Sequence, residues 1–334
     1  MIFFLDPVYM LLAMLGYLLM LVLASTIAPK VASRVSGKFS LFASMVLLAF
    51  MIVSISTATI YIILSFAGYY ISFYGLILFM IAINLLMYLV SPFIINVSYR
   101  AKRDERLQMV VNSVARRLNI KPPKAVVVST PPNAFAYGNI LSGKYVAVSD
   151  TLMSMLDRDE LEAVIGHELG HHKHKDNLVM LFFGLLPSVI FYLGYALIHA
   201  SFRDDRRGMQ LAAIGFAAVL VSFIVQILVL AFSRLREYYA DFEGVRATSK
   251  DAMQKSLAKI HLFYHRYPRY ADIIADSKFR TLFIYALVNA VAEPITRMDI
   301  ERLKKAKVSP LQEFLSTHPP IPKRLRFIDT IRIF

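Results

Sequence analysis

The sequence contains no cysteine and no tryptophan, and acidic residues are scarce: 23 Asp and Glu stand against 37 Lys and Arg among 334 residues. Without cysteine, disulfides and thiolate metal ligands are excluded, so a bound zinc ion would have to be held by histidine and carboxylate side chains. Charge as a whole is also scarce, since 18% of the residues are charged and 57% are hydrophobic. This composition is high in apolar residues for a soluble domain and predicts a protein that is partly embedded in lipid.

The net charge of +14 is compatible with a nucleic-acid-binding protein. The basic residues, however, gather beside the long apolar segments, where the positive-inside rule and attraction to anionic lipid account for them. We therefore expect the lipid bilayer as a partner and no nucleic acid.

Five apolar segments reach the length of about 20 residues that a membrane-spanning helix needs. They are residues 8–28, 41–67, 73–97, 178–200 and 209–232. The first is not expected to be a secretory signal peptide, because it lacks a basic start and its apolar run is too long. The predicted organisation is three N-terminal transmembrane helices (1–99), the first half of a more polar domain (100–176), a transmembrane hairpin (177–232) and the second half of that domain (233–334).

The distribution of basic residues predicts the orientation of these spans. By the positive-inside rule, the amino terminus lies outside, and residues 100–176 and 233–334 lie in the cytoplasm. The residues in favour are Lys30, Arg34 and Lys38 after the first span and Arg100, Lys102, Arg103 and Arg106 after the third, while Arg203, Arg206 and Arg207 oppose it. We expect a multi-pass protein of the cell membrane with a cytoplasmic active site.

The most informative motif is His167-Glu168-Leu169-Gly170-His171, directly before the fourth apolar segment. Two histidines four residues apart on a helix lie on one face, as joint ligation of a zinc ion requires. The glutamate after the first histidine is placed to act as a base on a water at the open position of the metal. The motif indicates a zinc-dependent hydrolase.

A third ligand is expected at Glu237, which follows the last apolar segment. A hairpin of two spans would bring this stretch back beside the first half of the domain. Asp241 is one helical turn further, so one carboxylate can bind the metal while the other accepts the second N–H of a ligand histidine. The alternative is a solvated helix in which Arg234 and Arg236 pair with these acids.

His174 is a less suitable third ligand, because one straight helix cannot readily place three ligands tetrahedrally around a metal. The longer zinc motif would also require Gly at 174 and His at 177, where this chain has His174 and Asn177. We interpret residues 172–175 as a polar belt at the lipid headgroups.

Around the motif, periodicity predicts a small mixed domain. An apolar stripe indicates a helix over 104–118, and apolar runs indicate buried strands at 125–128 and 145–148. Residues 133–138 are expected to form an edge strand, and the motif helix is expected to begin at Asp157 or Asp159. Further on, 252–262 is predicted to be an amphipathic helix, and 281–292 is too short to span a membrane and is predicted to be a core helix.

Four motifs in order resemble the HtpX-type membrane zinc metalloproteases, which are related to the Ste24 and OMA-type proteases of peptidase family M48. They are the zinc motif, Ser-Arg-x-Arg-Glu-x-x-Ala-Asp at 233–241, Asn-Ala-Phe-Ala-x-Gly at 133–138 and His318-Pro319-Pro320. The resemblance covers residues 100–334. It implies an α-helical integral membrane protein with a mainly helical, zincin-like α+β cytosolic catalytic domain that contains a small β-sheet. This chain has three spans before that domain, where the family commonly has two.

The resemblance also implies roles for single residues in a gluzincin-type site with one Zn²⁺ per chain. His167, His171 and Glu237 are the implied zinc ligands, Glu168 the general base and Asp241 the partner of a ligand histidine. Asn133 and Ala134 match the strand that pairs with an extended substrate, although Asn133 could instead be a turn residue after Pro131-Pro132. His318 and Arg324 match positions that donate to the substrate or the developing oxyanion, or their segment is a packed cap.

The implied function is zinc-dependent hydrolysis of peptide bonds in misfolded or damaged membrane proteins, or other unfolded polypeptides, at the cytoplasmic membrane face. Two alternatives stay open. A non-catalytic quality-control scaffold would use zinc structurally, with four protein ligands. An intramembrane-cleaving protease would carry the motif inside an apolar span, whereas here charged residues flank it. The sequence leaves the oligomeric state and the natural substrates open.

Overall fold

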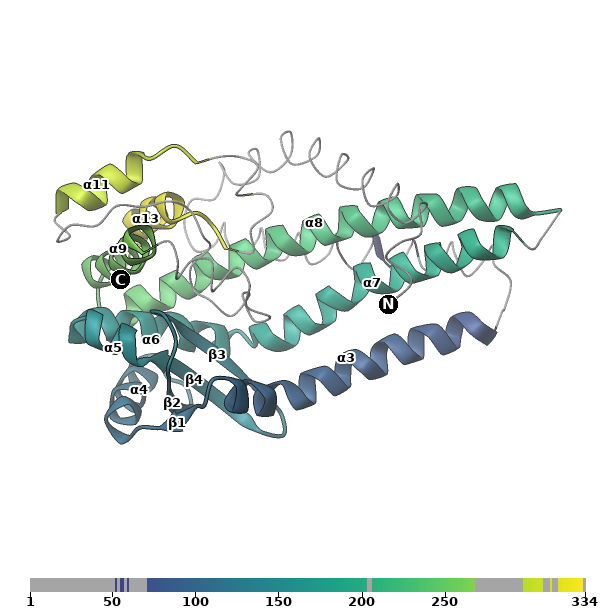
Figure 1. The fold of residues 1–334 in the computed structure, drawn as a ribbon. Coiled ribbons are helices and arrows are strands. Elements are labelled where there is room, and N and C mark those ends of the chain that lie inside the picture. The colour runs from purple at the N-terminus through teal and green to yellow at the C-terminus, as the bar shows by residue number, and fades with distance from the viewer. Residues whose placement is uncertain are drawn as a thin grey trace. The chain divides into compact units, whose positions relative to one another are not determined.

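The computed structural model describes residues 71–202, 206–267, 297–308 and 318–332, together with Ile52, Ile55, Ser56, Thr59 and Glu313. The protein is mostly helical, with one small mixed sheet (Figure 1). The predicted span 8–28, nearly all of 41–67, and the predicted core helix 281–292 lie outside the described residues.

The sheet has four strands in the order β1-β2-β4-β3. The strands are β1 (Lys102–Arg103), β2 (Lys124–Val128), β3 (Ala134–Asn139) and β4 (Gly143–Ser149). β2 and β4 are parallel, and β1 and β3 run antiparallel to their neighbours. The two strands predicted from apolar runs are confirmed, and the strand predicted at 133–138 is observed as β3, at the edge of the sheet as expected.

The tight β3–β4 turn requires glycine. Gly138 has φ +133° and a Cβ there would lie 2.1 Å from the Gly143 carbonyl oxygen. No L side chain is compatible with this position, which explains the last residue of the Asn-Ala-Phe-Ala-x-Gly motif.

Helix α4 (Glu105–Arg117) begins and ends where local sequence signals predict, and helix α6 (Arg158–Lys173) begins where they predict. Helix α4 is capped by Asp104, and its apolar stripe, including Leu107 and Val111, is buried. Helix α6 carries the zinc motif. It begins with a capping box, in which Asp157 and Glu160 each accept the backbone N–H of the other. The short helix α5 (Asp150–Met155) connects β4 to α6.

Three long helices cover apolar segments of the sequence. Helix α3 (Ile71–Ser98) covers the third predicted span and contains the shorter apolar stretch Asn84–Ser98. In the described part of the chain, α7 (Asp176–Ser201) and α8 (Gly208–Ala247) are long and apolar enough to cross a membrane by length and composition. At 40 residues α8 is about 60 Å long, twice the hydrocarbon thickness of a bilayer. Its polar last part, beyond Phe232, therefore extends well past any single crossing.

The remaining described helices are α9 (Lys250–Arg266), α11 (Arg297–Lys305) and α13 (Ile321–Thr330). Helix α9 contains the predicted amphipathic segment 252–262. The described residues divide into two compact units. One contains 71–87, 179–202 and 206–232, and the other contains 88–178, 233–267, 297–308 and 318–332. Every residue predicted for the site belongs to the second unit.

Candidate metal centre

The site forms where α6 and the last turns of α8 approach each other through small residues. A Cβ on Gly166 would lie 2.4 Å from the Ala247 Cβ, and one on Gly170 would lie 3.0 Å from the Ala240 Cα. The two helices therefore touch backbone to backbone. Ala240 is one turn beyond Glu237, so this contact brings Glu237 beside the zinc motif.

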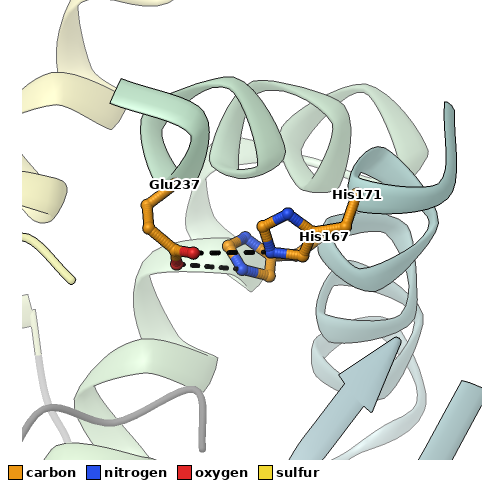
Figure 2. A group of neighbouring side chains, drawn as sticks. All are labelled: His167, His171 and Glu237. Carbon is orange, nitrogen blue, oxygen red and sulfur yellow. Dashed lines mark ion pairs between the residues drawn. The ribbon is translucent and has the colours of Figure 1, made fainter. Parts of the chain in front are cut away.

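Three side chains converge at this contact: His167 and His171 from α6 and Glu237 from α8 (Figure 2). One ligand atom from each lies within 4.8 Å of the others. His167 Nε2 is 3.6 Å from Glu237 Oε2, and His171 Nε2 is 3.6 Å from Glu237 Oε1. Two zinc ligands at bond lengths of about 2.1 Å and a tetrahedral angle are about 3.4 Å apart, so these separations suit a shared metal ion.

Two buried polar atoms in the cluster also fit a metal ion. His167 Nε2 and Glu237 Oε2 are buried without a hydrogen-bond partner, and their separation is too long for a hydrogen bond to each other. Unsatisfied buried nitrogen and oxygen atoms are costly. A cation held by two imidazoles and a carboxylate would satisfy both.

The other ring nitrogen of His167 is held by a buried chain of charges. Its Nδ1 is 3.0 Å from Asp241 Oδ1. Arg324 in turn donates to Asp241 through Nε (2.9 Å) and Nη2 (2.5 Å). Asp241 and Arg324 are fully buried. The structure thus places Asp241 beside His167, and this contact aims His167 Nε2 at the point where the three side chains converge.

The partner of His171 is Asp176, which was not among the residues predicted for the site. The His171 Nδ1 atom lies 2.6 Å from Asp176 Oδ2 at the start of α7, and Arg236 Nη1 lies 3.4 Å from the same oxygen. Asp176 is 3% exposed. The available signal was an acidic residue five positions after the motif, just before an apolar segment, which is a costly place for an unpaired carboxylate. Each ligand histidine thus has its own aspartate.

Glu168 lies on α6 between the ligands and the edge of the sheet. Its side chain is 3% exposed, and its carboxylate accepts the backbone N–H of Ala136 in β3. Burial, reinforced by nearby Glu237, raises the pKa of Glu168 above its ordinary value, although the two ligand histidines oppose this. A carboxylate with a raised pKa is better suited to accept and then return a proton.

Charges around Glu237 favour its ionised form. Burial alone would raise its pKa, but His318, whose Nε2 is 3.6 Å from Glu237 Oε1, and His167 hold it well below the ordinary range. Burial lowers the pKa of His318 to about 4. Burial also lowers the pKa of His167, but its hydrogen bond to Asp241 and the nearby Glu237 carboxylate outweigh this and raise the pKa to about 9. Without a metal, His167 holds a proton that a metal would displace.

Arg324 and His318, which were both predicted to act on the substrate, differ in their position in the site. The Arg324 guanidinium is fully buried behind His167, which favours a positioning role over direct donation to a substrate. The His318 side chain is 12% exposed and lies beside Glu237, so it stays a candidate for contact with a substrate.

Asn133 and Ala134 differ in how their backbones are used. Asn133 donates its N–H to Ser149 Oγ (3.0 Å), and its carbonyl accepts the Ser149 N–H (2.8 Å). This pairing does not fit the prediction that Asn133 grips a substrate through its backbone. In an antiparallel pair of strands, alternate residues direct their backbone N–H and C=O groups toward and away from the partner strand. Since Asn133 pairs with Ser149, Ala134 and Ala136 direct theirs away from β4. Ala134 stays the candidate for pairing with a substrate.

The predicted headgroup belt at 172–175 is wrong for His172, which is buried. The His172 Nε2 atom is 2.7 Å from the Tyr145 carbonyl oxygen. Lys173 Nζ donates to Glu243 (3.0 Å), and His174 Nε2 is 3.6 Å from the same carboxylate. These contacts join the end of α6 to β4 and α8 within the protein.

Comparison with known proteins finds a matching family model and several relatives. A family model described as Peptidase family M48 matches residues 101–332. A protease HtpX homolog from Archaeoglobus fulgidus is 80% identical over 334 residues, which cover 100% of both chains. A protease HtpX homolog from Pyrobaculum aerophilum is 52% identical, covering 98% of each chain. Among solved structures, the crystal structure of S. mikatae Ste24p matches with a TM-score of 0.49 and 18% identity, covering 88% of this chain and 68% of that one.

Proposed function

Because this chain belongs to peptidase family M48, we propose that it is a membrane-bound zinc endopeptidase that hydrolyses peptide bonds of unfolded or damaged membrane proteins at the cytoplasmic face. The observation that carries the proposal is the convergence of His167, His171 and Glu237. Glu168 lies between the two histidines on helix α6. Three protein ligands with one open position are typical of catalytic rather than structural zinc.

The donor set supports zinc as the metal. Two imidazoles and one carboxylate suit this ion, and the chain has no cysteine to offer instead. When bound, zinc would polarise the scissile carbonyl and make a water molecule more acidic. Asp241 and Asp176 hold the two histidines in the tautomer whose Nε2 faces the metal position.

The proton is carried by Glu168. Its carboxylate takes the proton of the attacking water and passes it to the leaving amine. The edge strand β3 lies against this residue through the Ala136 N–H. An extended substrate that pairs with β3 beside Ala134 would thus bring its scissile bond near Glu168. Strand pairing uses main-chain bonds and accepts many sequences, which suits an enzyme that acts on unfolded polypeptides.

The membrane location is supported by the order of elements along the chain. Helix α6 ends at Lys173 and the apolar helix α7 begins at Asp176, while Glu237 follows the apolar part of α8. A hairpin of two spans returns the chain to the side it left, so both halves of the site share one compartment. The basic residues after the third predicted span favour the cytoplasm for that compartment.

One observation favours the structural-zinc scaffold as a second candidate. His318 Nε2 lies as close to Glu237 as the two ligand histidines do and would close the site as a fourth ligand. Among the described residues, however, the group whose ligand atoms all lie within 4.8 Å comprises His167, His171 and Glu237.

The test is metal-dependent cleavage of an unfolded protein by the purified enzyme in detergent. We expect a chelator to stop cleavage, added zinc to restore it, and Glu237→Ala to lose both zinc and cleavage. Glu301→Ala, at an exposed residue of α11, is the matched control and should keep both. Stoichiometric zinc without any cleavage would support the scaffold instead.

A further inference from the structure

The turn between β3 and β4 holds two large apolar side chains in the open. Ile140 is 80% exposed and Leu141 is 76% exposed. The turn is ordered, because Asn139 Oδ1 accepts the N–H groups of Leu141 (3.0 Å) and Ser142 (2.8 Å). Adjacent exposed apolar side chains on a fixed turn indicate a contact surface.

The turn is docked along helix α3. Three contacts join β3 to the last turns of this helix. The ring of Phe135 packs against that of Tyr99, with centroids 5.5 Å apart. The Tyr137 hydroxyl donates to Asn96 Oδ1 (2.6 Å). Asn139 Nδ2 donates to the carbonyls of Tyr88 (2.9 Å) and Leu89 (2.8 Å). Tyr137 contacts Asn96, and Asn139, which is nearer the turn, contacts Tyr88, which is nearer the start of α3.

Pro92 explains why Asn139 binds at this level. A proline inside a helix has no N–H for the carbonyl four residues earlier, here that of Tyr88. The Ser91 hydroxyl (3.0 Å) and Asn139 Nδ2 (2.9 Å) both donate to this carbonyl in its place. The docking is therefore specific to this point of α3, where the nearby side chain of Phe93 is 70% exposed.

The docking point lies well inside the apolar part of α3. Tyr88 precedes the last helical residue, Ser98, by about 15 Å at 1.5 Å per residue. The charged sequence begins only after Ser98, at Arg100. If α3 crosses a bilayer, the β3–β4 turn is carried into the same layer. Near the turn, Lys124 Nζ donates to the Ser142 carbonyl (3.2 Å), a suitable place for a cation among lipid headgroups.

We propose that the β3–β4 turn inserts Ile140 and Leu141 into the lipid bilayer beside α3. This inference rests on the membrane location in the proposed function. The turn is a second membrane anchor of the catalytic unit, separate from the spans. It fixes edge strand β3 at the membrane surface, so that a substrate segment leaving the bilayer meets this strand first.

The absence of tryptophan gives a direct test, because a single introduced tryptophan is the only one in the protein. The full-length variant Leu141→Trp is reconstituted in phosphatidylcholine–phosphatidylglycerol vesicles with and without brominated acyl chains. Met109→Trp, at a 65% exposed position on α4, is the aqueous control. Phe182→Trp, at a 59% exposed position on α7, is the lipid reference.

The inference predicts that brominated lipid quenches most of the emission of Leu141→Trp and Phe182→Trp, while acrylamide quenches Met109→Trp. Quenching of Leu141→Trp by acrylamide but not by lipid, with Phe182→Trp quenched by lipid, would overturn the insertion and leave the proposed membrane location standing. A Leu141→Trp signal protected from both quenchers would also overturn it and point to contact with a second copy. Loss of lipid quenching in both variants would overturn the membrane location too.

Discussion

At the scale of single residues, two aspartates lie behind the histidines of the candidate metal centre. Asp241 and Asp176 each accept a hydrogen bond from a ligand histidine, at 3.0 and 2.6 Å. Such contacts fix the ring orientation and raise the basicity of the ligand. They come from different elements, α8 and the start of α7, so both must be in place before the two Nε2 atoms face one point.

The Asp176 contact gives a first prediction. Asp176→Asn should weaken zinc binding by about 10- to 100-fold, because the His171 ring loses its charged partner. The measurement is a competition titration with a zinc chelator. Asp251→Asn is the matched control, since Asp251 lies on α9 and pairs with Lys255 in the open. An unchanged zinc affinity in Asp176→Asn would contradict the role assigned to this contact.

His172 gives a prediction about acid stability. Burial lowers its pKa in the folded protein to about 4, below the ordinary 6.5. Between these values the unfolded chain binds the extra proton, so the stability from this residue is complete above pH 6.5 and is lost as the pH falls toward 4. The difference of about 2.5 units corresponds to at most about 3 kcal/mol.

The measurement is the unfolding free energy in detergent at pH 7 and pH 5, compared between the wild type and His172→Gln. Glutamine can still donate to the Tyr145 carbonyl but does not titrate. We expect the variant to lose part of the decrease in stability between the two pH values. An identical decrease in both proteins would show that His172 does not cause it.

The residues of the site were predictable to different degrees for a physical reason. His167, Glu168 and His171 follow a spacing set by the helix itself, so the local sequence suffices. Glu237 was predicted from chain order, because a membrane hairpin brings it back. Asp176 was not predicted, since its role depends on the turn between α6 and α7. The backbone pairing of Asn133 with Ser149 is likewise a tertiary contact without a local signal.

At the scale of elements, the backbone contact between α6 and α8 sets the ligand geometry. Gly166 and Gly170 alternate with the ligand positions on α6 and face Ala247 and Ala240 on α8. A larger side chain at either glycine would push Glu237 away from the histidines. This contact links the glycine of the zinc motif to the alanine of the second motif.

Gly166→Ala should therefore reduce both stability and zinc affinity. The new Cβ would lie 2.4 Å from the Ala247 Cβ, and such overpacking typically costs about 1–3 kcal/mol. Thermal unfolding and zinc titration measure the two effects. Gly184→Ala on α7 is the control, because a Cβ there meets nothing within 4 Å. Equal unfolding temperatures for the two variants would contradict the close approach.

Elements with strong local signals were predicted well. An apolar stripe predicted α4, and capping residues predicted the start of α6. Apolar runs predicted β2 and β4. The sequence analysis did not predict that the last apolar segment and the Glu237 helix form one continuous helix, α8. Hydropathy changes at Phe232 while helix propensity does not, so a hydropathy pattern alone marks no helix boundary there.

At the scale of the whole molecule, the proposed enzyme divides one catalytic unit between two stretches of chain separated by an apolar hairpin. The first stretch supplies the zinc motif and the edge strand, and the second supplies Glu237, Asp241 and Arg324. Neither stretch contains a complete site. Zinc binding thus depends on the association of the two, and we expect the zinc-bound protein to unfold at a higher temperature than the zinc-free protein.

The proposed role of Glu168 is tested by comparing the wild type with Glu168→Gln for zinc content and cleavage of an unfolded protein. Glutamine keeps the shape of the side chain but cannot accept the proton of the attacking water. We expect one zinc ion per chain in both proteins and a loss of cleavage of at least about 100-fold in Glu168→Gln. Full cleavage by a zinc-loaded Glu168→Gln protein would contradict this role.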